Sequence, residues 1–187
     1  MKNLLVLGLD VSISCTGYCV LDRQGSIDLG LHVVEIDRIE LSKFKSFWEK
    51  ADAVRNVLRD IASRYVNDEF CVAIEEPLLG FKQGMSSAAT LAALLKFNGI
   101  VSYLSRETFS VDPIYASATH ARKVCGVKIQ KTSACGLSAK EQTFLHMSSN
   151  DLKHVNWPTN RNGKIVPWSR DATDAYCIAR AISIENS

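Results

Sequence analysis

The sequence lacks several features that would assign it to a class at once. Its six cysteines include no Cys-x-x-Cys pair, so the ligand spacing of a structural zinc site is absent. Such isolated thiols are typical of small core residues in a reducing compartment. No apolar run reaches the ~20 residues that a membrane span needs. The apolar run 4–9 is also too short for a signal peptide and leads into Asp10 without a cleavage site, so it is better explained as a buried strand. These absences predict a cytoplasmic protein.

A strong overall charge is also absent, because the net charge is only +2. The charge is nevertheless unevenly distributed: residues 120–170 hold nine Lys or Arg against two acids, a net +7, and the rest of the chain is net −5. A basic C-terminal half on a near-neutral protein suits a polyanion such as nucleic acid, although a solvated face has the same composition.

The length of 187 residues suits one compact domain, and no internal repeat or low-complexity tract divides it. Apolar alternation and short apolar runs predict strands at 4–10, 18–21, 27–36, 70–74 and 109–111. Helical spacing predicts a long amphipathic helix after Ser42, and helices at 86–104, 120–125, 138–147 and 171–184. This order predicts an α/β fold, a mixed sheet flanked by helices.

Four acidic residues lie where a purely structural interpretation explains them poorly. Asp10 and Glu75 each end an apolar strand, where an unpaired carboxylate is costly. Asp171 and Asp174 are three residues apart at the start of the last helix and so project from one face. Taken singly, Asp171 and Asp174 are better explained as a helix-dipole acid and a surface residue.

Taken together, the four acids indicate a metal site. Carboxylates that converge repel one another unless a cation lies between them, and oxygen ligands suit Mg²⁺ or Mn²⁺ rather than zinc. Two such ions about 3.5–4 Å apart would contact the attacking and leaving oxygens of a phosphodiester. The pattern therefore favours a metal-dependent nuclease with Asp10, Glu75, Asp171 and Asp174 as ligands.

Four segments resemble the ordered motifs of RuvC-type Holliday junction resolvases. Gly8-x-Asp10 with Thr16-Gly17-Tyr18 resembles the first motif, and Ala73-Ile74-Glu75 resembles the second. The segment 139–142 with His146-Met147 resembles the basic helix before the last motif, and 171–175 with Ile178-Ala179 resembles that last motif. The matches are in family order and span nearly the whole chain.

The resemblance implies an RNase H-like fold, a homodimer, and Mg²⁺-dependent paired cleavage of four-way DNA junctions. It implies that Asp10, Glu75, Asp171 and Asp174 bind the metal, as two ions in each active site. It also implies that Lys140, and more loosely Lys131, face phosphates near the cut, where a lysine stabilises developing charge. The candidate dimer interface is the apolar, small-residue helix 86–104, whose alternative is burial within one subunit.

The sequence departs from the family pattern at three places. Val11-Ser12 follows the first acid where the family has Pro-Gly, and Leu78 stands where a base-stacking aromatic is expected, so stacking is assigned to Phe81. The segment 151–170 is longer than the family's equivalent. It contains an Asn-Gly pair with tryptophans, Arg161 and Lys164, which predicts a hairpin that contacts DNA or, alternatively, a loop anchored by its tryptophans. These departures indicate a divergent member, of viral or organellar origin.

Three other functions fit parts of the pattern. A nuclease for structured RNA would use the same acids. A nucleotide-binding domain of the actin and sugar-kinase type shares the Gly-x-Asp and Thr-Gly turn, but its second phosphate loop is absent and it needs about twice this length. A non-catalytic junction-binding module would not need all four acids.

Overall fold

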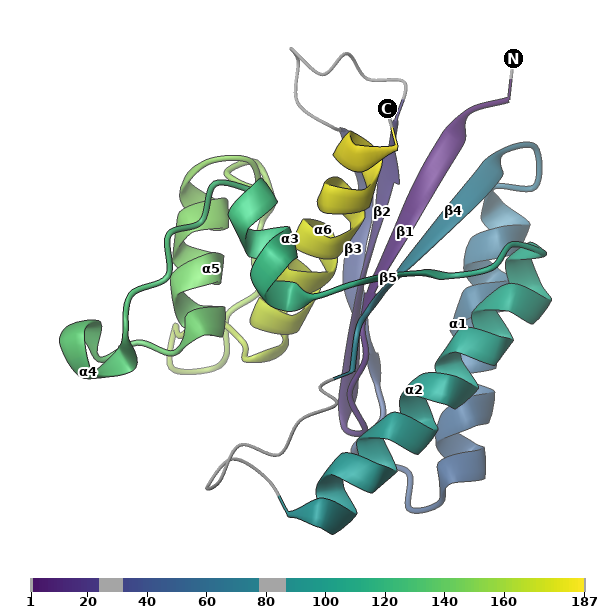
Figure 1. Cartoon of the computed structure of the whole chain (residues 1–187), viewed down its shortest axis with the longest axis horizontal. Coiled ribbons are helices and arrows are strands. Elements are labelled where there is room, and N and C mark those ends of the chain that lie inside the picture. Colours follow the sequence, from purple (N-terminus) through teal and green to yellow (C-terminus); the bar gives the residue numbers. More distant parts are fainter. Residues whose placement is uncertain (1, 24–31, 78–86, 187) are drawn as a thin grey trace.

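A mixed five-stranded sheet forms the centre of the molecule (Figure 1). The computed structural model describes residues 2–23, 32–77 and 87–186. The strand order is β3-β2-β1-β4-β5, with β1 antiparallel to β2, β2 antiparallel to β3, and parallel pairing of β1 with β4 and of β4 with β5. The strands are β1 (Leu4–Asp10), β2 (Cys15–Asp22), β3 (His32–Glu40), β4 (Glu69–Glu75) and β5 (Ile114–Ala116). The predicted α/β class is confirmed.

Two helices cover one face of the sheet (Figure 1). They are α1 (Phe47–Arg64), which begins with a capping box between Ser46 and Glu49, and α2 (Ala88–Phe109). Their buried side chains meet alternate residues of the strands, among them Leu5, Leu7 and Leu9 of β1, which are almost fully buried. This face is a large apolar core, because leucine, isoleucine, valine and phenylalanine dominate it.

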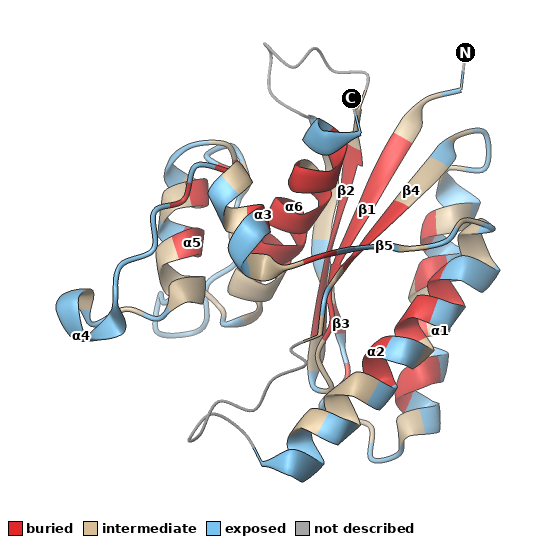
Figure 2. Cartoon of the chain, viewed as in Figure 1, coloured by how far each residue is buried: buried red, intermediate tan, exposed pale blue. Residues whose placement is uncertain are grey.

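The opposite face carries α6 (Trp168–Glu185), with α3 (Ala118–Val124) and α5 (Ala139–Ser149) packed against it. A one-turn helix, α4 (Thr132–Cys135), lies at the outer end of this layer, away from the sheet (Figure 1). Burial is greatest at the centre of the molecule, since β1, β2 and α6 are largely buried while α4 is mostly exposed (Figure 2). Side chains alternate across a strand, so Val6, Gly8 and Asp10 of β1 face α6.

Two of the predicted strands have different bounds. The strand predicted at 109–111 is wrong, because α2 continues to Phe109, whose ring packs 4.5 Å from Phe70, and ends at Ser110 in the left-handed conformation (φ 56°). The last strand is β5 instead. The strand predicted at 27–36 begins outside the described residues and continues to Glu40, since β3 pairs with β2 along that length.

The helix α2 is the one described helix that is long and apolar enough to cross a membrane, a test that core helices also pass. Its inner side is buried at Phe97, Val101 and Leu104 and packs against α1 and β4. Its outer side leaves Tyr103 61% exposed, and Gly99 faces open space. The helix is therefore a covering helix of the sheet with one side unpaired.

Candidate active site

Asp10 and Glu75 lie side by side at the ends of two neighbouring parallel strands. Leu9 of β1 pairs with Ile74 of β4, so the next residue of each strand projects toward α6. Asp10 is only 2% exposed, and its carboxyl group shares a side-chain hydrogen bond with Glu75. Parallel pairing thus brings together two acids that are 65 residues apart in the sequence.

Two glycines allow α6 to lie directly on the sheet above these acids. A Cβ atom on Gly8 would overlap the carbonyl oxygen of Ala175 and come within 2.8 Å of the Ala179 methyl group. A Cβ atom on Gly17 would overlap the Asp171 carbonyl group and come within 2.6 Å of the Ala172 nitrogen. The contacts between the helix and strand backbones at these two points fix the distance between α6, which carries Asp171 and Asp174, and the strands that carry Asp10 and Glu75.

The ammonium group of Lys140 lies among three of the four acids. Its Nζ atom is 2.6 Å from an oxygen of Asp10, 2.6 Å from one of Asp171 and 3.7 Å from one of Asp174. Lys140 is the second residue of α5, which begins with a capping box between Ser138 and Glu141. The helix start therefore directs the lysine at the cluster, where it contacts carboxylates, while its predicted role toward phosphate stays a prediction.

Burial and mutual repulsion make these carboxyl groups hard to ionise. Burial, followed by the hydrogen bond with Glu75, raises the pKa of Asp10 to about 8, against the opposing effect of Lys140. Burial also raises the pKa of Asp171 and of Asp174. For Lys140 burial lowers the pKa, but the neighbouring carboxylates outweigh it and the net shift is upward. A cation close to these groups favours their ionised form, because the opposite charge offsets the cost of burial.

A second cation, Arg122 of α3, binds Asp174, the last of the four acids in the sequence. Its Nε atom donates to one oxygen of Asp174 at 3.0 Å and its Nη2 atom to the other at 2.7 Å. The sequence predicted a helix at 120–125, but no feature of the sequence indicated a role for Arg122. A helical lysine-arginine pair is common on solvated faces, and only the packing of α3 on α6 shows which one turns inward.

No family model and no curated protein matches this sequence, but solved structures with a similar fold do. Thermus thermophilus RuvC in complex with a Holliday junction substrate has a TM-score of 0.65 at 15% identity, over 97% of this chain and 95% of that chain. A second Thermus thermophilus RuvC structure gives 0.61 at 15% identity over 97% and 96%. The yeast mitochondrial Holliday junction resolvase Ydc2 gives 0.54 at 12% identity over 95% and 77%.

The fold is that of RuvC. The RNase H-like architecture that the motifs implied is thereby confirmed, and its agreement over nearly the whole chain covers the segments that carry all four acids.

The acids of this RuvC-like fold suit a hard divalent ion by their chemistry. Asp10, Glu75 and Asp171 present only oxygen atoms, and Lys140 already stands between Asp10 and Asp171 as a positive charge. Among the described residues, no three Asp, Glu, His or Cys side chains are gathered as a ready metal site. The oxygen-only donor set fits Mg²⁺ or Mn²⁺ by its chemistry, but its geometry is organised around the lysine ammonium and not around a metal ion.

The other described candidates for DNA contact lie outside α5 and α6, the helices that carry Lys140, Asp171 and Asp174. Lys131 caps α4, while Arg161 and Lys164 lie on a narrow hairpin, and all three are exposed. Thr159 pairs with Ile165 at the base of this hairpin, and the Asn160 side chain accepts hydrogen bonds from two backbone N–H groups within it. Phe81, the candidate stacking aromatic, lies outside the described residues, as does Leu78.

The two tryptophans of the segment 151–170 are packing residues. Trp157 makes an edge contact with Phe144 at 5.3 Å between ring centroids and packs against the core beside α6. Trp168 is the first residue of α6, and the Arg38 guanidinium lies 4.5 Å above its ring. Of the two interpretations of this segment, the packing contacts support tryptophan anchors and leave Arg161 and Lys164 as its exposed groups.

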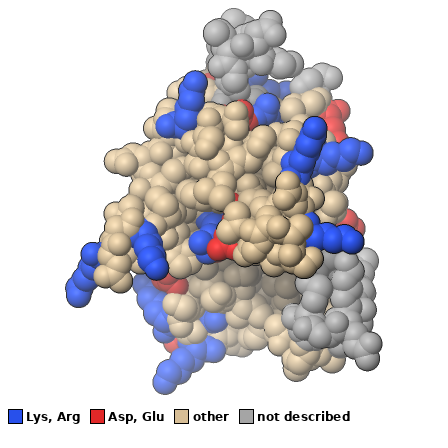
Figure 3. Space-filling view, turned by 90° about the vertical axis from the view of Figure 1, so that its left-hand side faces the viewer, with Lys and Arg blue, Asp and Glu red and all other residues tan. Residues whose placement is uncertain are grey.

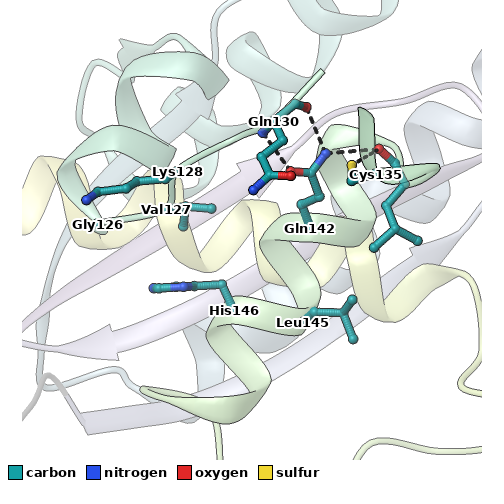
Figure 4. A pocket seen from close by; sticks show the side chains of 9 residues that line it. Gly126, Val127, Lys128, Gln130, Cys135, Gln142, Leu145 and His146 are labelled. Carbon is teal, nitrogen blue, oxygen red and sulfur yellow. Dashed lines mark hydrogen bonds between the residues drawn. The ribbon is translucent and has the colours of Figure 1, made fainter. Parts of the chain in front are cut away.

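A cavity of about 540 Å³ lies beside α5, outside the acid cluster (Figure 4). One side is the segment 126–137, which the Gln142 side chain ties to α5 by accepting from the Gln130 backbone N–H and donating to the carbonyl oxygens of Gln130 and Leu137. These bonds satisfy the Gln142 amide and hold the segment that carries Lys128 and Lys131 against α5, while Lys128 and His146 also line the cavity.

Proposed function

We propose that this protein is a divalent-metal-dependent endonuclease that resolves four-way DNA junctions. The single observation that carries the proposal is the convergence of Asp10, Glu75, Asp171 and Asp174 with Lys140 at one end of a RuvC-like sheet. Four buried or half-buried acids, three of them around one lysine, are unfavourable for stability alone, so their presence together favours chemistry. One RuvC structure of this fold contains a Holliday junction substrate, which supports the choice of DNA.

Asp10, Glu75 and Asp171 are the residues that would hold Mg²⁺ or Mn²⁺. When bound, such an ion makes water a better nucleophile and stabilises charge on the leaving oxygen. Asp174 was predicted as a further ligand, but Arg122 holds both of its oxygens. Lys140, whose side chain is 39% exposed, is free to turn from the carboxylates toward a phosphate and stabilise its developing charge.

The cationic lobe, residues 118–166, supplies the surface for DNA. Its exposed cations have no carboxylate partner among the described residues: Lys123, Lys128, Lys131, Lys153, Arg161 and Lys164. Its two acids are already paired, Glu141 with Arg170 at 3.2 Å and Asp151 with Arg180. Lys and Arg side chains are spread over the face that carries this lobe and outnumber the acidic ones visible there (Figure 3). Unpaired cations at this density favour contact with phosphates.

Paired cuts require two active sites related by the near two-fold symmetry of a junction, so we propose a homodimer. The exposed outer side of α2, with Tyr103 and the open position at Gly99, is the candidate interface. Sedimentation at micromolar concentration, with and without a junction, measures the oligomeric state. A monomer under both conditions would exclude the dimer. The mitochondrial source of Ydc2 is compatible with an organellar origin for this chain, which stays a prediction along with its cellular location.

The test is a panel of labelled four-way junctions, flaps, duplexes and structured RNAs, with and without Mg²⁺. We expect symmetric nicks in the junction only with the metal, and a loss of orders of magnitude in Asp10→Asn, which keeps the side-chain size but removes a charge. Junction binding without metal should be unchanged or tighter in that variant, because a negative charge near phosphate is gone. Preferential cutting of RNA would replace the junction by an RNA substrate, and near-normal nicking by Asp10→Asn would exclude the metal site altogether.

A further inference from the structure

The two cations of the acid cluster are held in different ways. Lys140 reaches the acids with one ammonium group on a flexible stem and is 39% exposed. Arg122 is 12% exposed and grips Asp174, which is 2% exposed, with two parallel hydrogen bonds. A bidentate guanidinium–carboxylate pair has a fixed geometry and is strong when buried. The lysine is therefore displaceable, while the arginine is a permanent neighbour of its acid.

The two hydrogen bonds from Arg122 also limit the ability of the Asp174 oxygens to coordinate a metal ion. Arg122 takes a hydrogen-bonding position on each oxygen of Asp174, and the same Oδ2 atom lies 3.7 Å from the Lys140 ammonium. A guanidinium stays charged at any pH at which the protein is folded. A divalent ion bound to Asp174 would therefore lie close to a fixed positive charge that cannot leave, and this opposes coordination.

We propose that Arg122 permanently neutralises Asp174, so that the metal is held by Asp10, Glu75 and Asp171 as a single ion and Asp174 is not a ligand. This inference rests on the proposed nuclease function. Arg122 is then a positioning residue: it fixes Asp174 on α6 and supplies, on that side of the cluster, the positive charge that a second ion would bring. The four acids carry four negative charges when ionised, and Arg122 with Lys140 offsets two of them.

A charge-neutral double variant tests this. Arg122→Gln with Asp174→Asn removes one positive and one negative charge together, so the long-range field on the metal is unchanged, and the two amides can hydrogen-bond to each other. Mn²⁺ affinity is measured by electron paramagnetic resonance of the free ion, with melting curves on the same preparations. We expect the double variant to bind Mn²⁺ within a few-fold of the unmodified protein, while Asp171→Asn, the matched loss of one acid on α6, weakens binding about tenfold or more.

The single variant Arg122→Gln gives a readout that a purely structural pair would not change. It frees a buried carboxylate beside Asp10, so Mn²⁺ should bind more tightly, or as a second equivalent, and the gain should vanish when Asp174→Asn is added. If Arg122→Gln does not fold, the double variant still decides. A double variant that loses Mn²⁺ as strongly as Asp171→Asn overturns the inference and leaves the proposed function standing. Absence of Mn²⁺ binding by the unmodified protein would instead remove the metal site of the proposed function.

Discussion

The two faces of the sheet are built in opposite ways. On the face covered by α1 and α2, large apolar side chains such as Leu58, Ile61 and Phe97 are fully buried and hold the helices away from the strands. On the other face, α6 rests on Gly8 and Gly17 through its own backbone and its alanines. Large apolar side chains fill the space between the sheet and the α1–α2 layer. On the other face the backbone of α6 contacts the backbone of the strands directly.

This difference separates stability from placement. An apolar core tolerates small shifts, because side chains of similar volume repack with limited cost. A helix that touches two neighbouring strands at glycines has no such freedom, so Asp171 is held at a fixed distance from the strand that carries Asp10. The carboxylates therefore lie on the face where position is set by backbone contact, which is the requirement of a site whose groups must meet within a few tenths of an ångström.

The largest effect on cleavage should follow from adding one methyl group on the α6 face. In Gly17→Ala, the new Cβ atom meets the backbone of Asp171 and Ala172, which cannot retreat like a flexible side chain. We expect loss of cleavage together with destabilisation of at least about 1–3 kcal/mol, the usual cost of overpacking. Chemical unfolding and junction nicking measure the two effects.

Gly99→Ala is the matched control for the stability of that variant, and not for its nicking, because Gly99 also belongs to the proposed dimer interface. Gly99 lies within α2 and nothing approaches its missing Cβ atom, so alanine there should stabilise the helix by about 0.5–1 kcal/mol. Equal behaviour of the two alanine variants would contradict the distinction between the faces.

The apolar face should show the reverse pattern. Phe97→Ala removes a fully buried ring from the core under α2, and its edge contact with Phe47 at 5.9 Å, so we expect a loss of about 3–5 kcal/mol of stability. Nicking per folded molecule, measured well below the melting temperature, should be unchanged. A specific loss of nicking in a folded Phe97→Ala protein would show that this face also places the acids.

Removing the displaceable cation should have a smaller effect, which depends on metal. Without Lys140, the carboxylates of Asp10 and Asp171 lose their shared partner, so Lys140→Ala should melt a few degrees lower in chelator. Added Mg²⁺ should raise the melting temperature more in the variant than in the unmodified protein, because the ion supplies the missing charge. An equal Mg²⁺ effect in both would mean that lysine and metal do not share a site.

The smallest effect should come from single cations of the lobe. Lys164→Ala should lower the log–log salt slope of junction binding by about 0.9 and leave stability unchanged. Lys2→Ala is the control, since Lys2 precedes β1 at the end opposite Asp10 and pairs with Glu69 at 3.8 Å. If both variants give the slope of the unmodified protein, the lobe is a solvated face only.

The sequence predicted the elements whose pattern is local. The apolar run ending in Asp10, the amphipathic helix after Ser42 and the paired acids at 171 and 174 all lie in elements of the predicted type. The bounds were less accurate: α6 begins at Trp168, and the helix containing Phe109 was divided into a helix and a strand, because an aromatic after a short polar stretch looks like a strand start.

What the sequence did not give depends on contacts between distant segments. The role of Gly8 and Gly17 becomes clear only when α6 lies on them, although they were noticed as part of a motif. Arg122 was missed because nothing in its neighbourhood distinguishes it from Lys123, and its partner is 52 residues away. The family resemblance implied that Lys140 faces phosphates near the cut, whereas its hydrogen bonds with both Asp10 and Asp171 become visible only through the packing of α5.

The edges of the sheet limit how copies of this chain can associate. One edge strand, β5, has only three residues, and the other, β3, carries charged residues along most of its length, including Glu35, Asp37 and Arg38. Short edges and charged edges both discourage the addition of a strand from another molecule. Two copies are therefore not expected to pair edge to edge into one continuous ten-stranded sheet, and we expect any association of copies to use the helical surfaces instead.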